Sequence, residues 1–411
     1  MPALALVACS GDDGGSSATT TTVVTPTSEL RVDDGEFVLG VVTPTLGIGA
    51  EIGQSVRAAV QMAVTDVNAG GGIGGQRVRV IRRDEGDDPA AALRAVQDLV
   101  EAGADAIIGP TSSVNVLGSL GTAVDAGVLT CAPTATALSL DEFPDNGLLV
   151  RTSPSDALQA QALAQVVDES GADRAVVLYL DDPYGRGLAD EVQGALVGQG
   201  TIVTTAIGFT ESEDDIAAAA ERVAATDPSM IVVIANDDAG PLVIDAVEAA
   251  VGVPRPSYVV NDAMRRPGAT SDPFTGSVAG RIEGVSPVAY ADTRFFVDGL
   301  AEVDGSASGL YAANAFDCVN LIALAGAATG TTEPAAIAAA IAAVSSGGTT
   351  CSSYPRCLEA LDEGRNINYD SPAGALDIGA DGDPSKAVFE RFTFDIFGAD
   401  ISGRTLTVTG G

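Results

Sequence analysis

The sequence predicts an α/β protein with two doubly wound parallel sheets, and three observations support this class. Short apolar runs alternate with segments whose apolar residues recur at helical spacing, which is the pattern of strand–helix units. The alternation occurs in two series, and each series is long enough for one domain of the 411-residue chain. Hydrophobic residues make up 46% of the chain and charged residues 19%, a composition that can build a folded core.

The first series of strand–helix units begins at Phe37. The continuous apolar run from this residue is expected of a strand that is buried on both faces. Asp88 and Pro89 predict the start of a helix, because Asp caps helices and Pro suits their first turn. The expected strands are residues 37–42, 78–81, 104–109 and 128–132, and the expected helices are 53–68, 112–126 and one from residue 88 onward.

The second series starts after Arg151. Its expected strands are residues 175–180, 202–206, 230–234 and 258–260, and its expected helices are 157–170, 187–198, 214–225 and 241–250. After Gly284 the pattern predicts helices at 310–325 and 335–344 and strands near Leu376 and Phe392. These pieces are too few for a third domain, so we expect them to complete the first two.

Composition excludes several classes of function. The chain has no histidine, which removes Ser-His-Asp catalysis and His-ligated metal sites. Lys386 is the only lysine, and a net charge of −35 disfavours a nucleic-acid partner. The glycines at 70–75 follow a helix and precede a strand, the reverse of a phosphate loop, so they predict a turn. We expect no catalytic residue, cofactor or metal. The acidity indicates a hydrated surface, or alternatively the steering of a cationic ligand.

The N-terminus is typical of an exported lipoprotein. Residues 6–9, Leu-Val-Ala-Cys, resemble a bacterial lipobox, in which the cysteine receives lipid and the chain is cut before it. Residues 10–35 are rich in Gly, Ser, Asp and Thr, which predicts a flexible tether. We therefore expect residues 1–9 to be the remnant of a signal, lipid on Cys9, and anchoring to the outer face of the cell membrane. A chance Ala-Cys pair is the alternative.

Four further cysteines fit a location outside the cytoplasm. An even number in an oxidising compartment suggests disulfides. Cys351 and Cys357 flank a short segment that contains Pro355, and we favour this pair; Cys131 would then bond to Cys318 by elimination. The alternative is that Cys131 and Cys318 are small core residues.

Polar residues follow the carboxyl ends of the expected strands, where open α/β sheets bind ligands. The ends in the first series supply hydroxyls and helix N-termini, which suit an anion. The ends in the second series supply carboxylates and a tyrosine, which suit a cation. If the two sheets face each other, the cleft suits a zwitterion, although each residue could also be an ordinary cap or turn residue. These segments are residues 43–45, 111–113, 133–136, 181–184, 236–238 and 261–262.

The order of these motifs resembles the leucine/isoleucine/valine-binding proteins, which are substrate-binding proteins of ABC transporters with the type I periplasmic-binding fold. The resemblance runs through nearly all of the chain from Phe37, including Leu39-Gly-Val-Val-Thr-Pro44, Asp182-Pro-Tyr-Gly-Arg-Gly187 and residues 311–317. It implies two lobes that are joined by three crossover segments and close over a ligand cleft. Lobe 1 would comprise residues 36–152 and 284–345, and lobe 2 residues 153–283 and 346–411.

The resemblance also implies binding residues in lobe 1. Ser113, with Ser112, would bind the ligand carboxylate through hydroxyl and backbone N–H groups. Thr136 would act in the same way, and the carbonyl of Thr134 would face the ligand ammonium.

Lobe 2 would supply Tyr184, which closes over the ligand, and Asp262, which pairs with the ammonium in place of the family's usual Glu. Branched-chain binders place aromatic residues near the side-chain pocket, where this chain has Glu51-Ile52 and residues 236–238. The added carboxylates, Asp238 among them, favour a polar or cationic ligand such as a basic amino acid.

We therefore expect a lipid-anchored, monomeric binding protein of an ABC importer, with an ABC permease as its membrane partner. Its ligand would be a small amino-acid-like solute, either a branched-chain or a polar amino acid or an amide. A sensor of the same fold is the first alternative. An enzyme that uses the paired aspartates at 181–182 and 237–238 is the second, and the missing histidine speaks against it.

Overall fold

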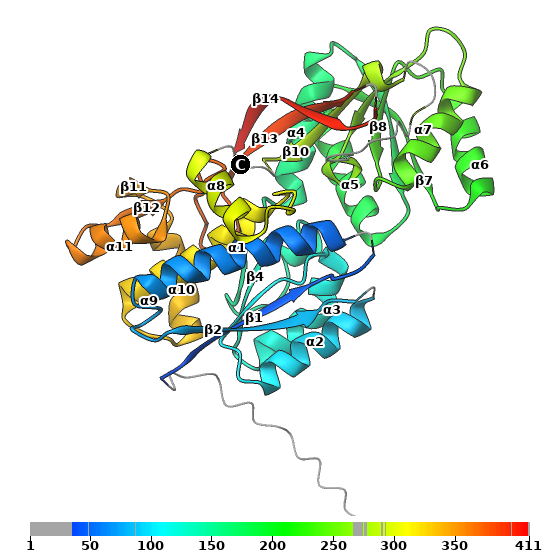
Figure 1. The fold of residues 1–411 in the computed structure, drawn as a ribbon. Helices are drawn as coiled ribbons and strands as arrows, with labels where there is room; N and C mark the ends of the chain where they lie inside the picture. Colours follow the sequence, from blue (N-terminus) through cyan, green and yellow to red (C-terminus); the bar gives the residue numbers. More distant parts are fainter. Residues whose placement is uncertain are drawn as a thin grey trace, which may run out of the picture.

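The computed structural model describes residues 35–409 except 48, 87, 266–273, 275–277, 289–290, 292 and 396. The predicted class is confirmed, because two α/β lobes each contain their own sheet (Figure 1). The chain passes between the lobes three times, at residues 152–155, after residue 287 and at residues 379–385. Cys9 and all but the last residue of the expected tether lie outside the described residues.

Lobe 1 is built on a parallel five-stranded sheet with the order β2-β1-β3-β4-β5. The whole of β1 is buried, as its apolar run predicts. Asp88 caps α2 by accepting the N–H of Ala91 at 2.7 Å. The sheet and its helices are β1 (Phe37–Thr43), α1 (Ala50–Ala69), β2 (Val78–Asp84), α2 (Pro89–Glu101), β3 (Ala106–Ile108), α3 (Ser113–Asp125), β4 (Leu129–Ala132) and β5 (Leu149–Arg151). The sequence did not predict β5, which has three residues.

Segments from the C-terminal half complete lobe 1. Among the described residues, α9 is the one helix that is long and apolar enough to cross a membrane, and 83% of it is buried inside the protein. In Figure 1 it lies beside α1 and α10, and its side chains are buried in the core of the lobe. The added segments are α8 (Arg294–Val303), α9 (Ala312–Thr329), α10 (Pro334–Val344), β11 (Thr349–Cys351), α11 (Tyr354–Asp362) and β12 (Ile367–Tyr369).

Lobe 2 contains a mixed seven-stranded sheet with the order β14-β13-β10-β9-β8-β6-β7. Strands β6 to β10 are parallel, whereas β13 and β14 form an antiparallel hairpin at one edge. Its strands are β6 (Arg174–Leu180), β7 (Ile202–Phe209), β8 (Met230–Ile234), β9 (Ser257–Val260), β10 (Ile282–Pro287), β13 (Lys386–Phe394) and β14 (Asp400–Thr409). Its helices are α4 (Asp156–Glu169), α5 (Pro183–Gly198), α6 (Glu213–Ala224) and α7 (Ala239–Ala250).

The lobe boundaries differ from the expected ones in two places. Residues 346–378, expected in lobe 2, belong to lobe 1, because Tyr354 and Tyr369 are buried in one core with α1 and α9. The hydroxyl of Tyr354 also donates to the carbonyl of Gly72 at 3.0 Å. Residues 284–287, expected at the start of the second part of lobe 1, belong to strand β10, which pairs with β9 and β13 in lobe 2. The expected strand near Leu376 is reduced to a single bridge, between Ile378 and Pro384.

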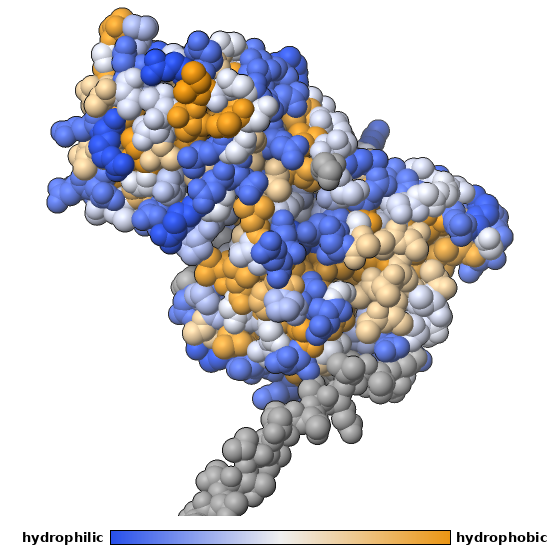
Figure 2. Space-filling model, turned by 180° about the vertical axis from the view of Figure 1, so that it is seen from behind, coloured by the Kyte–Doolittle hydropathy of each residue, from blue (hydrophilic) through white to orange (hydrophobic). Residues whose placement is uncertain are grey.

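Two disulfides are present in lobe 1. Cys131 at the end of β4 is bonded to Cys318 of α9, across 187 residues of sequence. The expected Cys131–Cys318 disulfide is therefore present, and both cysteines are also buried in the core of the lobe. Cys351 and Cys357 join β11 to α11. The face opposite to that in Figure 1 mixes hydrophilic and hydrophobic residues over both lobes (Figure 2).

Candidate ligand-binding site

A cleft of about 590 Å³ lies between the lobes at the carboxyl ends of their parallel strands. Its volume is in the range of small-molecule sites. Lobe 1 contributes Gly49, Glu51, Ile52, Thr111, Ser112, Ser113, Val114, Thr134, Thr136, Leu310 and Tyr311. Lobe 2 contributes Asp182, Tyr184, Asn236, Asp237, Asp262, Ala263 and Arg265. The structure thus brings together six of the seven residues that the sequence predicted for the site.

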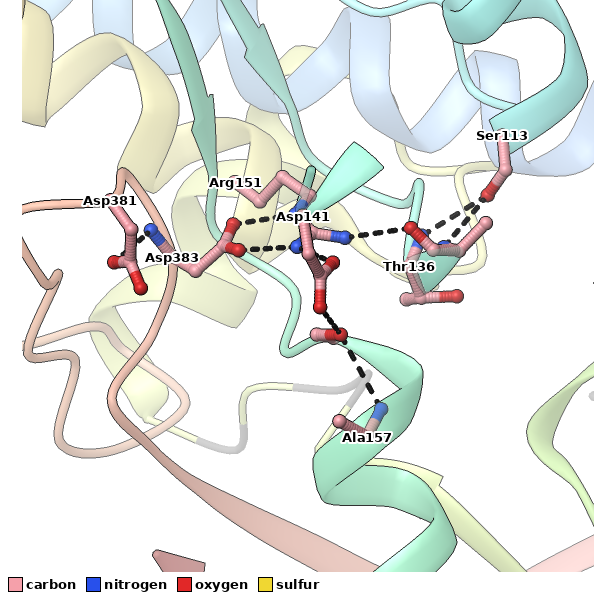
Figure 3. A network of polar contacts seen from close by, with 9 residues as sticks. Ser113, Thr136, Asp141, Arg151, Ala157, Asp381 and Asp383 are labelled. Carbon is pink, nitrogen blue, oxygen red and sulfur yellow. Dashed lines mark hydrogen bonds and ion pairs between the residues drawn. The ribbon is translucent and has the colours of Figure 1, made fainter. Parts of the chain in front are cut away.

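Ser113 presents hydrogen-bond donors to the cleft. Its Oγ accepts the backbone N–H groups of Thr136 and Ala137, each at 3.2 Å (Figure 3). Because these two donors occupy the lone pairs of the oxygen, the hydroxyl hydrogen of Ser113 remains to be donated. Ser113 and Val114 also open helix α3, where the first N–H groups have no intrahelical acceptor. This end of the cleft therefore suits an anion such as a carboxylate.

Ser112 lines the same end, but its hydrogen bonds serve the helix. Its Oγ accepts the N–H of Asn115 at 3.2 Å, and its own N–H donates to Glu85. The buried carboxylate of Glu85 also accepts from Thr111 and Asn115, and so holds the start of α3 from behind. Thr134 donates its hydroxyl to the carbonyl of Thr111 at 2.5 Å. Ser113 is therefore the stronger candidate of the two serines.

Asp262 is the centre of a second group of contacts. Its carboxylate accepts from Gln159 at 2.7 Å, from Tyr184 at 3.2 Å and from Tyr311 at 2.8 Å. Tyr184 in turn accepts from Asn261 at 3.1 Å. Burial, aided by the negative charge of Asp262, raises the pKa of Tyr184 well above its ordinary value, so this tyrosine is a neutral donor. Three neutral donors thus hold one negative charge at the wall of the cleft.

Tyr311 is one of the cleft residues that the sequence interpretation missed, together with Arg265 and Leu310. It precedes α9 in lobe 1, so its hydrogen bond to Asp262 of lobe 2 crosses between the lobes. Its backbone is left-handed, with φ of 56°, a conformation that is uncommon outside glycine and often marks functional positions. The motif at residues 311–317 gave a signal for the helix, but not for the direction of the tyrosine.

Asp238 does not lie in the cleft, which corrects the prediction for this residue. Asn236 Oδ1 accepts the N–H groups of Asp238 and Ala239 at 3.2 and 2.7 Å. This turn closes the start of α7 and leaves Asp238 exposed to solvent. Asn236 and Asp237 line the cleft instead.

The lining of the cleft is acidic. Four of its residues are acidic: Glu51, Asp182, Asp237 and Asp262. The basic residue Arg265 is ion-paired with the buried Glu390 and lies over the ring of Phe392. Its charge is therefore largely neutralised from behind. Within the described residues, no three acidic or cysteine side chains lie close enough to hold a metal ion.

Arg151 forms a buried network behind the cleft. Its guanidinium donates to Asp383, to Asp141 and, at 3.3 Å, to the carbonyl of Ala137 (Figure 3). Asp141 also accepts at 2.8 Å from Ser155, which caps α4. Burial opposes the charge of Arg151, but the two carboxylates raise its pKa above the ordinary value. Since Ser155 and Asp383 lie in the first and third crossovers, the network ties the cleft to the connections between the lobes.

Known proteins share this fold. Residues 36–379 match the family model described as periplasmic binding protein. The chain is 27% identical to the chemotactic signal transduction system substrate-binding protein BasB of Halobacterium salinarum. The match extends over 354 residues and covers 83% of each chain. It is 29% identical over 189 residues to a Leu/Ile/Val-binding protein of Rhizobium johnstonii, 46% of this chain and 51% of the relative. The crystal structure of a leucine-binding protein from Thermotoga maritima superposes with a TM-score of 0.71, 17% identity and coverage of 90% and 98%.

Proposed function

Since the chain belongs to the periplasmic binding protein family, with leucine/isoleucine/valine-binding proteins among its relatives, we propose that it is an extracytoplasmic receptor that captures an amino acid between its lobes. One observation carries this proposal. The cleft offers the donors of Ser113 on one side and the carboxylate of Asp262 on another. These groups match the carboxylate and the ammonium of an amino acid, and charge-assisted hydrogen bonds would give both affinity and orientation.

We further propose that the ligand has a polar or cationic side chain. Glu51, Asp182 and Asp237 supply negative charge beyond the Asp262 group, whereas Ile52 and Leu310 supply apolar contact for a short aliphatic stem. A branched-chain side chain would bring no positive charge or hydrogen-bond donor to this acidic lining, whereas a polar or cationic side chain would. Both tyrosines of the cleft are already engaged with Asp262.

Binding involves capture rather than turnover in this proposal. The relatives are named as binding proteins, and the cleft holds no histidine or lysine for acid–base or nucleophilic chemistry. The hydrogen bond from Tyr311 to Asp262 joins the lobes at the wall of the cleft. We propose that this contact orders the closed form around the bound amino acid.

The receptor would deliver its ligand to an ABC permease, and lipid on Cys9 would hold it at the outer face of the membrane. The lipobox-like residues 6–9 support the anchor. A second candidate role is chemosensing, because the relative that matches over 83% of both chains is named as part of a chemotactic system. The same cleft would serve either role, and the membrane partner would differ.

Isothermal titration calorimetry against the twenty amino acids tests the proposal. A ligand at one hundred times its Kd adds about 2.7 kcal/mol of stability, so a thermal-shift screen should identify the class first. Asp262→Asn should then weaken binding by roughly 10-fold or more. Asp238→Asn is the matched control, because its side chain lies outside the cleft, and it should bind as the wild type does. A folded protein that binds no amino acid would overturn the proposal.

Uptake of the labelled ligand separates the two roles. Cells that lack the receptor should lose uptake if it serves an importer. If they keep uptake but lose movement toward the ligand, the receptor is a sensor.

A further inference from the structure

Asp156 is a buried carboxyl group that lies directly behind a residue of the cleft. It is the first residue of α4 and is 1% exposed. Its N–H donates to the carbonyl of Thr136 at 2.8 Å, and the Thr136 side chain lies close enough to the carboxyl group to lower its pKa. Its Oδ1 has no hydrogen-bond partner among the described residues. Lobe 2 therefore holds a titratable group against a lobe 1 residue that faces the ligand.

The carboxyl group of Asp156 forms no ion pair among the described residues. Arg151 acts on it electrostatically, but the Arg151 guanidinium is paired with Asp141 and Asp383 (Figure 3). Burial raises the pKa of Asp156 to about 8. The contact with the Thr136 side chain works against this increase, whereas the negative charge of Asp262 adds to it. Asp156 is therefore mostly protonated at neutral pH. The titratable and charged groups that act on it are Asp141, Arg151, Tyr184 and Asp262.

The proton on Asp156 decides which way the hydroxyl of Thr136 points. A protonated carboxyl group can donate its O–H to Thr136 Oγ1, which leaves the Thr136 hydrogen for the cleft. An ionised carboxylate only accepts, so it takes that hydrogen for itself. Thr136 then offers the cleft nothing but lone pairs, which a ligand carboxylate cannot use.

We propose that Asp156 is a positioning residue whose proton turns Thr136 into a hydrogen-bond donor for the ligand carboxylate. The proposal rests on the proposed function, because it takes the ligand to be an amino acid. It makes ligand affinity depend on pH with a definite sign: affinity falls as the pH rises through the titration of Asp156. An ammonium group near Asp262 acts in the opposite direction, because it favours the ionised carboxylate.

The size of the effect follows from the fraction of receptor that is competent to bind. If only the protonated form binds, the competent fraction falls from nearly one at pH 6 to about a quarter at pH 8.5, so Kd should rise about four-fold. The α-ammonium of a free amino acid titrates above this range, and the chain has no histidine that would titrate in it.

Titration calorimetry at pH 6, 7 and 8.5, with the amino acid that the screen identifies, tests the inference. The wild type should lose affinity about four-fold. Asp156→Asn keeps a permanent N–H donor toward Thr136, so it should bind as tightly as the wild type at pH 6 and show a flat profile. Thr136→Val should bind more weakly and also show a flat profile, whereas Thr136→Ser should restore the dependence. A purely structural role of Asp156 would change stability without flattening the profile.

Three results would overturn the inference: a flat wild-type profile, affinity that rises with pH, or a wild-type profile in Asp156→Asn. If that variant fails to fold, the Thr136 pair still decides, because Thr136→Val must abolish the dependence that Thr136→Ser keeps. Binding with a flat profile would leave the proposed function standing and remove only this inference. Absence of binding at every pH would remove both.

Discussion

Replacing Arg151 with methionine tests whether the buried network supports the hinge. The arginine side chain is 0% exposed, and its removal leaves the carboxylates of Asp383 and Asp141 facing each other without a counter-charge. Methionine has a similar length and fills much of the volume, so the lost charge dominates the effect. We expect the variant to unfold at a lower temperature and to bind its ligand less tightly.

The magnitude follows from burial. Removing one partner of a buried ion pair costs about 3–5 kcal/mol, because a charge is left without compensation. The side chains of Asp383 and Asp141 are 17% and 30% exposed, so water can reach both carboxylates. We therefore expect the lower end, about 3 kcal/mol. For a lobe of this size, 1 kcal/mol shifts the melting temperature by about 2–4 °C, which gives a decrease of roughly 6–12 °C.

Calorimetric melting of the wild type and the variant, at pH 7 and in the same salt, measures this decrease. Arg79→Met is the matched control, because Arg79 and its partner Glu36 lie 3.8 Å apart and are both more than half exposed. The control should change stability by no more than about 0.5 kcal/mol. A loss below about 1 kcal/mol in Arg151→Met would refute the argument, since the two carboxylates would then be stable without the arginine.

Three further predictions follow from the described contacts. Loop entropy predicts that Cys131→Ala with Cys318→Ala lowers the free energy of unfolding by about 5 kcal/mol, because this disulfide closes a loop of 187 residues. Cys351→Ala with Cys357→Ala, which opens a loop of six residues, should lower it by about 2 kcal/mol. Denaturant unfolding under oxidising conditions measures both losses. Burial raises the pKa of Asp317 to about 7. The folded state therefore keeps a proton that the unfolded state loses, and the stability of the wild type falls as the pH rises from about 4 to 7. Asp317→Asn should have a higher melting temperature than the wild type at pH 8, and the same melting temperature at about pH 4. Tyr311→Phe removes the hydrogen bond between the lobes and should weaken calorimetric ligand affinity several-fold, whereas unchanged affinity would exclude a role in closure.

Most of the fold followed from local patterns, because the longer expected elements satisfied several rules at once. The run at β1 is apolar throughout and is buried on both faces. Asp88 caps α2 and Pro89 lies in its first turn, as predicted. Asp182 and Pro183 start α5 in the same way, before the start that was expected at residue 187. Short elements such as β5 and β12 escaped prediction, because three residues carry too little periodicity and their strand form depends on a neighbouring strand.

The cleft was predictable in outline for a different reason. Parallel strands in one sheet end at one edge, so the residues after β3, β4, β6 and β9 had to gather wherever the lobes face each other. The positions of single side chains did not follow from this rule. Asp237 and Asp238 are neighbours after β8, in the turn that the side chain of Asn236 closes. Asp237 lines the cleft, whereas Asp238 is exposed to solvent.

The sequence by itself determined the α/β class, the two series of strand–helix units, the acidity and the residue types at the strand ends, because these depend on local periodicity and composition. Only the tertiary structure decided that residues 346–378 join lobe 1, that Tyr311 reaches Asp262, and that Asp156 lies behind Thr136. These contacts join segments that are far apart in the chain. Burial and low polarity, which change the pKa of Asp156, arise only when such segments pack together.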